Sequence, residues 1–284
     1  MKIIQLTKIT VLIIIMAQSN FMLSQKIITG IVTNSLNQNI QYANVGVLNK
    51  SIGTVTNSKG EFIIELDNTL MNDTLKISFL GYKSKEFVIK SLSEKVITIN
   101  LEKQVEELKE IMIIPRKTKT HIKGKKKSKS NNEVFFATPK SEYKNLGSEI
   151  GRKFSLGTKK ISFLNEFKFY IKKNNFDNIK FRINLYNIKE KVPFKNINDE
   201  NIFIEVSDKH IGWVKVDLKE YNISIKEDII ITVEWIESSK KGNELSLPIL
   251  IPSFSSTHFY KYGSQAKWRR YKSISSAMVL KYKQ

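Results

Sequence analysis

The sequence of 284 residues contains no cysteine. This absence excludes disulfide bonds, thiolate metal sites, a cysteine nucleophile and a lipid-modified cysteine at a processed N-terminus. Stability must therefore come from packed apolar cores. With 41% apolar residues, the chain is long enough for one large domain or two small ones.

Histidine is scarce, and the sequence patterns of common catalytic sites are missing. The three histidines, His121, His210 and His258, share no metal-ligand spacing, and the chain has no His-Glu-x-x-His run. The Gly-x-Ser-x-Gly elbow of hydrolases is also missing, since the run from Gly147 to Gly151 has a different spacing. No glycine-rich loop for phosphate opens a helix. We therefore expect no catalytic residue, no metal site and no cofactor.

The chain also lacks a long apolar run. The apolar stretch Ile9–Ala17 is followed by polar residues and stays well short of the ~20 apolar residues that span a bilayer. It lies behind Lys2 and Lys8, and a basic start before a short apolar core is typical of a secretory signal peptide. We expect residues 1–25 to be this signal, with cleavage near Ser24–Lys26; an uncleaved anchor is the alternative. The mature protein is then exported to the periplasm, the outer membrane or the cell surface, and is not transmembrane.

Acidic residues are few relative to basic ones, 27 against 47, so the formal net charge is +20. Such an excess favours an anionic partner, with nucleic acid the first class to consider. Export removes the protein from the usual location of nucleic acid, and lysine is abundant along the whole chain. We therefore interpret the charge as a basic solvated surface and expect no nucleic-acid partner.

One segment concentrates the positive charge. Pro115–Ser130 holds eight Lys or Arg, no acid and almost no apolar residue, so it cannot bury a core. We predict a linker over residues 104–132. It acts either as a solvated tether or as a contact with anionic lipid or lipopolysaccharide phosphate at the envelope.

Between Lys26 and Leu101 the apolar residues alternate with period two, which is typical of strands. Turn-rich breaks separate seven short runs, and this number and spacing predict a small antiparallel β-sandwich. The predicted strands are Lys26–Thr33, Gln41–Leu48, Ile52–Thr56, Glu61–Leu66, Thr74–Leu80, Tyr82–Lys90 and Lys95–Leu101.

The stretch Val55–Leu66, VTNSKGEFIIEL, predicts a tight hairpin within this sandwich. Gly60 supplies the positive φ that the turn requires, and Phe62 begins the alternation that carries Ile64 and Leu66 into the core. We interpret the hairpin as scaffold rather than as a site of chemistry.

Four motifs in this region resemble a known family. They are GIVT from Gly30, IQYANVGV from Ile40, GTVTNSKGEF from Gly53 and ISFLGY from Ile77. Together they look like the carboxypeptidase-regulatory-like domain, a transthyretin-like sandwich at the N-terminus of many secreted and outer-membrane proteins of the Bacteroidetes. The resemblance covers residues 26–103 and implies a non-catalytic module. Asn39 departs from the family, which often has proline there.

The segment that follows, Val105–Pro115, is similar to the segment behind this domain in TonB-dependent receptors. The chain is too short for the barrel of such receptors, so their transport function is not expected here. Two interpretations remain for the segment: a last strand or docking segment of the first sandwich, which we favour, or a contact with an envelope partner.

From Glu133 onward the period-two pattern returns in longer runs, with no helical period of useful length. We predict a second β-sandwich, of jelly-roll type, over residues 133–284. Phe181–Tyr186, Gly212–Leu218 and Ile230–Trp235 resemble the jelly-roll modules of secreted Bacteroidetes proteins. The clearest predicted strands are Lys160–Ile171, Asn178–Asn187, Asn201–Val206, Trp213–Leu218, Asp228–Ile236, His258–Tyr262, Lys267–Tyr271 and Ser276–Lys283.

Carboxylates on the strands of the second sandwich leave two functions open. Glu205, Asp217 and Glu234 are candidates for a catalytic pair, which would make the protein a carbohydrate-active enzyme. Such residues more often lie on a solvated strand face, paired with lysines. We favour the second interpretation.

Aromatic and basic residues of the second sandwich are the candidate ligand-binding site. They are Trp213, Tyr262, Trp268, Arg269 and Arg270. Exposed rings stack on sugars or cations, and arginine pairs with carboxylate or phosphate; the alternative is that the rings cover the end of the sandwich. We therefore expect an exported, non-enzymatic binding or assembly module, whose partner is a glycan or an envelope protein. Trp235, in contrast, shares a strand face with Ile229, Ile231 and Val233, so we expect it to lie in the core.

Overall fold

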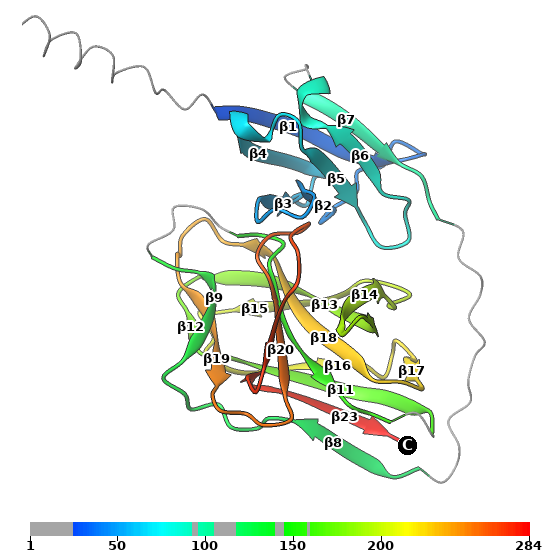
Figure 1. Ribbon diagram of the computed structural model, residues 1–284, viewed down its shortest axis with the longest axis vertical. Helices are drawn as coiled ribbons and strands as arrows, with labels where there is room; N and C mark the ends of the chain where they lie inside the picture. Colours follow the sequence, from blue (N-terminus) through cyan, green and yellow to red (C-terminus); the bar gives the residue numbers. More distant parts are fainter. Residues whose placement is uncertain (1–24, 93–95, 105–117, 140–144, 158–159) are drawn as a thin grey trace, which may run out of the picture.

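The computed structural model describes residues 25–92, 96–104, 118–139, 145–157 and 160–284. These residues form strands and two short 3₁₀ helices, and no α-helix occurs among them. Figure 1 shows two separate sandwiches, the first built from β1–β7 and the second from later strands. The prediction of an all-β chain with two sandwiches is confirmed. No helix in the described part of the chain has the length and apolar character to cross a membrane.

The first sandwich consists of two sheets. The three-stranded sheet has the order β4-β1-β7, in which β1 runs antiparallel to β4 and parallel to β7; the four-stranded sheet has the order β3-β2-β5-β6. The strands are β1 (Gln25–Asn34), β2 (Asn44–Val47), β3 (Gly53–Val55), β4 (Glu61–Asp67), β5 (Thr74–Ser78), β6 (Lys85–Val88) and β7 (Val96–Leu101), with 3₁₀ helices at Asn68–Leu70 and Ile89–Ser91. All seven predicted strands are present, but the prediction of an antiparallel sandwich is wrong for one pair, since β1 and β7 run parallel.

The alternation along β4 shows how the sequence sets the core of this sandwich. Phe62, Ile64 and Leu66 are 3%, 5% and 1% exposed, whereas Ile63 between them is 64% exposed. Successive side chains of a strand point to opposite faces, so the period-two pattern alone assigns these residues. The assigned inward faces of β5 and β7 are likewise buried at Leu75, Ile77, Ile97, Ile99 and Leu101.

Gly60 closes the turn before β4 with a φ of +74°, as predicted. A Cβ at this position would lie 2.9 Å from Cβ of Asn39 and 3.0 Å from the carbonyl oxygen of Val32. We expect Gly60→Val to lower the free energy of unfolding by about 2 kcal/mol, because a β-branched residue is strained at this φ and contacts fixed backbone. Thermal denaturation measures this loss. Lys59→Val in the same turn is the control and should change stability by less than ~0.5 kcal/mol; an equal loss there would contradict the backbone explanation.

The second sandwich has three sheets. The largest has the path β14-β13-β18-β10-β20-β21 with β15 beside β13; another has the path β16-β11-β23-β8 with β17 beside β11; the smallest has the path β12-β19-β22 with β9 beside β19. The strands are β8 (Thr120–Gly124), β9 (Glu133–Ala137), β10 (Glu149–Phe154), β11 (Ser162–Ile171), β12 (Lys173–Asn174), β13 (Asn178–Lys189), β14 (Val192–Asn196), β15 (Ile202–Ser207), β16 (Gly212–Asp217), β17 (Ser224–Ile225), β18 (Ile229–Ser238), β19 (Leu245–Leu250), β20 (Thr257–Lys261), β21 (Arg269–Lys272), β22 (Ser275–Ser276) and β23 (Met278–Lys283).

Aromatic side chains fill the core of the second sandwich. Phe136, Phe169, Phe181 and Trp235 are each fully buried. Phe181 packs edge-on against Phe169 with ring centroids 5.3 Å apart, and the indole N–H of Trp235 donates to the carbonyl of Glu237 at 3.0 Å. The prediction that Trp235 belongs to the core is confirmed.

Part of the predicted linker is a strand. β8 lies inside residues 104–132 and pairs antiparallel with β23 at the edge of its sheet. His121 stacks on the buried ring of Tyr282 with centroids 5.3 Å apart, and the positive φ of Gly124 (+117°) brings its backbone against Met278. A free edge can accept a strand whose own sequence has little apolar character, because the ladder is made of backbone groups. The prediction of a linker at residues 120–124 is therefore wrong.

The run around Pro248 and Pro252, which the sequence suggests is a loop because of its two prolines, also contains a strand. Pro248 lies within β19, opposite Glu133 of β9. Leu245 and Leu247 of this strand are buried, so its packing outweighs the missing N–H of the proline.

Candidate functional site

The two sandwiches meet through the residues around β2 and the outer face of β13. Tyr42, which is 2% exposed, packs edge-on against Phe203 with ring centroids 5.4 Å apart. Its hydroxyl donates to a carboxylate oxygen of Glu237 at 2.5 Å and accepts from Nζ of Lys180 at 3.1 Å. Burial and the bond to Glu237 raise the pKa of Tyr42, so it stays a neutral donor.

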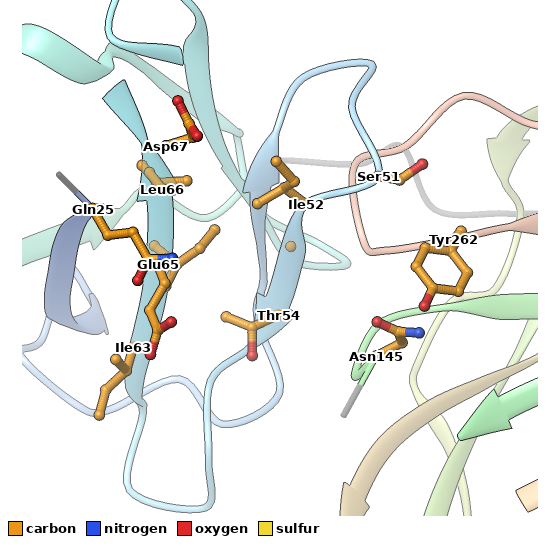
Figure 2. Close-up of a pocket in the computed structure, with 12 residues that line it drawn as sticks. Gln25, Ser51, Ile52, Thr54, Ile63, Glu65, Leu66, Asp67, Asn145 and Tyr262 are labelled. Carbon is orange, nitrogen blue, oxygen red and sulfur yellow. The ribbon is translucent and has the colours of Figure 1, made fainter. Parts of the chain in front are cut away.

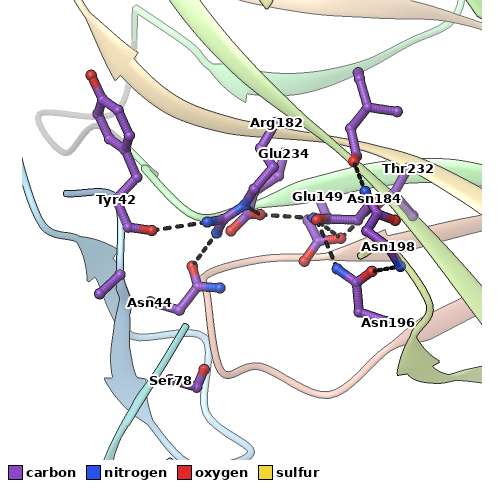
Figure 3. Close-up of polar contacts among 12 residues, drawn as sticks. Tyr42, Asn44, Ser78, Glu149, Arg182, Asn184, Asn196, Asn198, Thr232 and Glu234 are labelled. Carbon is purple, nitrogen blue, oxygen red and sulfur yellow. Dashed lines mark hydrogen bonds and ion pairs between the residues drawn. The ribbon is translucent and has the colours of Figure 1, made fainter. Parts of the chain in front are cut away.

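Arg182 on β13 is the central link between the sandwiches. Its side chain is buried and donates through Nη1 to the carbonyl of Tyr42 at 3.0 Å and through Nη2 to Oδ1 of Asn44 at 3.1 Å. Its Nε donates to Oε2 of Glu234 at 2.7 Å (Figure 3). One guanidinium thus joins the backbone and side chain of the first sandwich to a buried carboxylate of the second.

Behind Arg182 lie two buried carboxylates. Glu149 of β10 and Glu234 of β18 are direct cross-strand partners, and both are 0% exposed. The amide of Asn184 donates to Oε2 of Glu149 at 3.2 Å and to Oε2 of Glu234 at 2.8 Å. Within the part of the chain that the structure describes, Oε1 of Glu234 has no hydrogen-bond partner. The carboxylates belong to one connected network (Figure 3).

Glu149 has the larger set of partners. Lys261 forms a close ion pair with it, and the hydroxyls of Thr232 and Tyr186 donate to its Oε2 at 2.7 and 3.0 Å. Burial on its own would raise the pKa of Glu149, but the charge and hydrogen bond of Lys261, the Thr232 hydroxyl and the charge of Arg182 together lower it. Burial and the two carboxylates raise the pKa of Tyr186 well above its ordinary value. Glu149 is therefore a carboxylate at neutral pH, and Tyr186 is a neutral donor.

A cleft of about 530 Å³ opens beside this network, between the two sandwiches. Side chains from both contribute aromatic rings, amides and cations, and the described lining residues include no Asp or Glu. The rings are those of Phe79, Tyr82, Tyr186, Phe194 and Trp268; the amides are those of Asn44, Asn49, Gln104, Asn184, Asn196, Asn201 and Gln265; the cations are those of Lys76, Arg182, Lys195 and Lys261.

The connection between β20 and β21 closes one side of the cleft. Ser264 donates its hydroxyl to the carbonyl of Val45 at 2.7 Å, and the amide of Gln265 donates to Oγ of Ser78 at 2.8 Å. Gly53 permits this approach, because a Cβ there would lie 2.7 Å from Oγ of Ser264. The connection is thereby held against the first sandwich.

Of the predicted binding residues, only Trp268 lines this cleft. Its half-buried ring meets Tyr186 edge-on at 5.6 Å between centroids, and Nζ of Lys261 lies 4.9 Å from the ring centroid. Tyr262 lines a second pocket of about 370 Å³, shown in Figure 2. Arg269 and Arg270 are exposed on β21, outside both pockets.

Trp213 lies apart from the other predicted binding residues. It is on β16 in a different sheet, where its half-buried ring meets Tyr170 edge-on with centroids 5.5 Å apart. The structure therefore brings Trp268 and Tyr262 to the same connection and separates Trp213 from them.

The prediction that the strand carboxylates lie on a solvated face and pair with lysines is confirmed for Glu205 and Asp217 and is wrong for Glu234. Glu205 is exposed and pairs with Lys180 at 2.6 Å, and Asp217 is exposed and lies 3.8 Å from Lys219. Glu234 is not on a solvated face, because both faces of β18 are covered.

Sequence reasoning missed Glu149, Arg182, Asn184 and Lys261 as members of the buried network that contains Glu234. A signal was present in the polar stripe of two apolar strands: Arg182, Asn184 and Tyr186 alternate along β13, and Thr232 and Glu234 alternate along β18. Polar groups at every second position of a buried strand must find partners on one face.

Several solved structures show low similarity to the chain. The cysteine protease and lectin-like domains of Cwp84, a surface layer associated protein of Clostridium difficile, are 10% identical with a TM-score of 0.37, over 49% of this chain and 32% of that one. A streptococcal ancillary pilin is 8% identical with a TM-score of 0.21, over 91% of this chain and 59% of that one. BcpA, the major pilin subunit of Bacillus cereus, is 11% identical with a TM-score of 0.19, over 89% and 69%.

The chain spans about a third of the length of the first of these proteins. TM-scores this low support no conclusion about fold or function. No curated protein sequence matches the chain. Residues 28–113, in contrast, match the family model of the CarboxypepD_reg-like domain, so the first sandwich is a domain of that family, as the sequence motifs implied.

Proposed function

We propose that the chain is an exported, non-enzymatic binding module that holds a glycan of the cell envelope in the cleft between its two sandwiches. The lining of the cleft carries this proposal. Aromatic rings offer faces for the C–H groups of a sugar, and amides both donate to and accept from its hydroxyls. Trp268 and Tyr186 supply adjoining rings, and Asn196 and Gln265 supply amides beside them.

The carboxylates support binding rather than hydrolysis. Glu149 and Glu234 share the amide of Asn184, so they lie no farther apart than the two carboxylates of a glycosidase, which are ~5–10 Å apart. Distance alone therefore does not exclude a catalytic pair. Both are fully buried, and each is paired with a cation, Lys261 or Arg182. Neither carboxylate lines the cleft. A lowered pKa also makes Glu149 a poor general acid at neutral pH.

Export rests on the sequence pattern of Ile9–Ala17, which lies outside the described residues. The periplasm, the outer membrane and the cell surface all suit a chain whose first sandwich belongs to the CarboxypepD_reg-like family. The origin in the Bacteroidetes and the jelly-roll relationship of the second sandwich are part of the same proposal.

A glycan array probed with the purified protein tests the ligand class, and Trp268→Ala tests the site. We expect Trp268→Ala to weaken binding to any array ligand by a factor of about 5–150, the 1–3 kcal/mol typical of a lost stacking contact, and to leave the fold intact. Trp213→Ala is the matched control, because it removes a half-buried tryptophan from a different sheet. Its binding should match that of the unchanged protein.

Two results would contradict the proposal. One is equal loss of binding in Trp213→Ala and Trp268→Ala, which would remove the argument for the cleft. The other is a fall of more than ~10 °C in the melting temperature of Trp268→Ala, which would make this ring a structural plug, because a change of that size corresponds to several kcal/mol.

A further inference from the structure

Among the residues that the structure describes, no strand pairs with the outer edge of β4 in the first sandwich, and this edge lies away from the cleft described above. β4 pairs with β1 on one side and is the last strand of its sheet. The three-stranded sheet to which it belongs faces a sheet of four strands. An exposed edge strand presents unpaired backbone N–H and C=O groups in a row.

The register identifies which groups these are. The N–H of Val32 donates to the carbonyl of Gly60, so Val32 and Gly60 are a hydrogen-bonded pair of the β1–β4 ladder. Such pairs alternate with non-bonded pairs in an antiparallel ladder, which directs the backbone groups of Ile63, Glu65 and Asp67 away from β1. Within the described chain, no backbone hydrogen bond to residues 63–67 occurs outside the β1 ladder.

The pocket of about 370 Å³ runs along this edge. It is lined by five consecutive residues, Ile63 to Asp67, and by four consecutive residues, Ser51 to Thr54, at the edge of the facing sheet. Side chains of consecutive strand residues point to opposite faces, so one face alone cannot line the groove. The backbone of these residues therefore borders it. Figure 2 shows β4 and β3 on either side of the opening, with Tyr262 and Asn145 of the second sandwich beyond β3.

The charge of β4 indicates the occupant. Its outward face carries Glu61, Glu65 and Asp67, and no basic side chain in the described ranges pairs with any of them. Elsewhere in this strongly basic chain, exposed strand acids such as Glu86 and Glu205 have a lysine partner. A second copy pairing antiparallel through β4 would place acid beside acid, which destabilises a strand pair.

We propose that β4 binds an extended peptide segment of a partner protein, added as a fourth strand, with Lys or Arg at alternate positions beside Glu65 and Asp67. Backbone hydrogen bonds to residues 63, 65 and 67 give affinity, and the alternate basic side chains give specificity. Side chains of the added strand that point inward enter the groove beside Ile52 and Leu66.

Binding of two labelled ten-residue peptides to the full chain tests this inference. One peptide alternates lysine and valine, and the other alternates glutamate and valine. We expect only the first to bind, to bind more weakly as salt is raised, and to protect the amides of Ile63, Glu65 and Asp67 from hydrogen exchange.

Two variants of Glu65 separate backbone from charge. Glu65→Lys should weaken binding about tenfold because like charges then face each other. Glu65→Pro should weaken it by about two- to tenfold, because it removes an outward N–H and leaves the β1 ladder intact. Glu227→Lys makes the same charge change at an exposed turn of the second sandwich and should leave binding unchanged. Trp268→Ala should also bind the peptide normally, so this inference and the proposed glycan site fail independently.

The inference would be overturned by equal binding of both peptides, by no protection of the three amides on binding, or by equal weakening by Glu227→Lys. Protection of the three amides in the protein alone would likewise overturn it. Protection that rose with protein concentration would show that a second copy pairs with β4. Protection independent of concentration would show that another part of the same chain pairs with it.

Discussion

Arg182→Met is expected to lower the free energy of unfolding by about 3–5 kcal/mol, the loss typical when one partner of a buried ion pair is removed. The substitution leaves Glu234, which is 0% exposed, without its cation. It also removes the two donors that reach Tyr42 and Asn44 in the first sandwich. We therefore expect both lower stability and looser association of the two sandwiches. Chemical denaturation measures the first effect, and the rate of trypsin cleavage under native conditions measures the second.

The double variant Arg182→Met/Glu234→Leu is the control. Removing both charges should restore much of the lost stability, because an apolar pair of similar volume is often as stable as a buried ion pair. It should not restore the hydrogen bonds to Tyr42 and Asn44, so the association of the sandwiches should stay loose. If Arg182→Met cost less than ~1 kcal/mol, the buried network would not be the link that the geometry indicates.

Stability is expected to fall by about 2 kcal/mol between pH 7 and pH 5 because of His258. Burial, with a smaller effect from the charge of Arg152, lowers the pKa of His258 to about 4 from its ordinary value of 6.5. Arg152 is its cross-strand partner, Ser276 bonds its Nδ1 at 2.9 Å, and Tyr271 packs against its ring.

The sign of this effect follows from the protons bound. Between pH 6.5 and pH 4 the unfolded chain binds a proton at His258 and the folded protein does not, so stability rises with pH across that window. Denaturation at pH 7, 6 and 5 measures the slope. His258→Gln should flatten it, and since the other two histidines are present in both proteins, the difference isolates His258. Equal slopes in the two proteins would show that the folded His258 titrates normally. The paired carboxylates with lowered pKa, such as Glu149, contribute at lower pH.

The first sandwich was predictable because its signals are local. Alternation places Phe62, Ile64 and Leu66 inside without any knowledge of their partners, and the turn before β4 needs only Gly60. The family motifs add to this and agree with the family model. In the second sandwich, the same alternation found the long strands, such as β11 and β18, but missed several others, among them β8, β10 and β19. β8 and β19 hold their places through their neighbours, since their own sequences contain lysine, glycine or proline.

The candidate site was predictable only in part. Trp268 was selected for its neighbours in sequence, and the structure places it in the cleft. Trp213 was selected because it alternates with Lys215 and Asp217 on the polar face of its strand, and it lies in another sheet, since alternation does not tell which sheet a strand joins. Tyr262 shares the connection of Trp268 but lines a different pocket.

By itself, the sequence determined the absence of disulfides, the all-β character, the seven strands of the first sandwich and its core. The tertiary structure decided the buried network, the cleft and the open edge at β4. Glu149, Arg182, Glu234 and Lys261 come from four strands far apart along the chain, and each could equally have faced water. Period two reports only which side of a strand a residue occupies; what lies opposite that side depends on the order and register of the sheets, and these are set by packing across the whole chain.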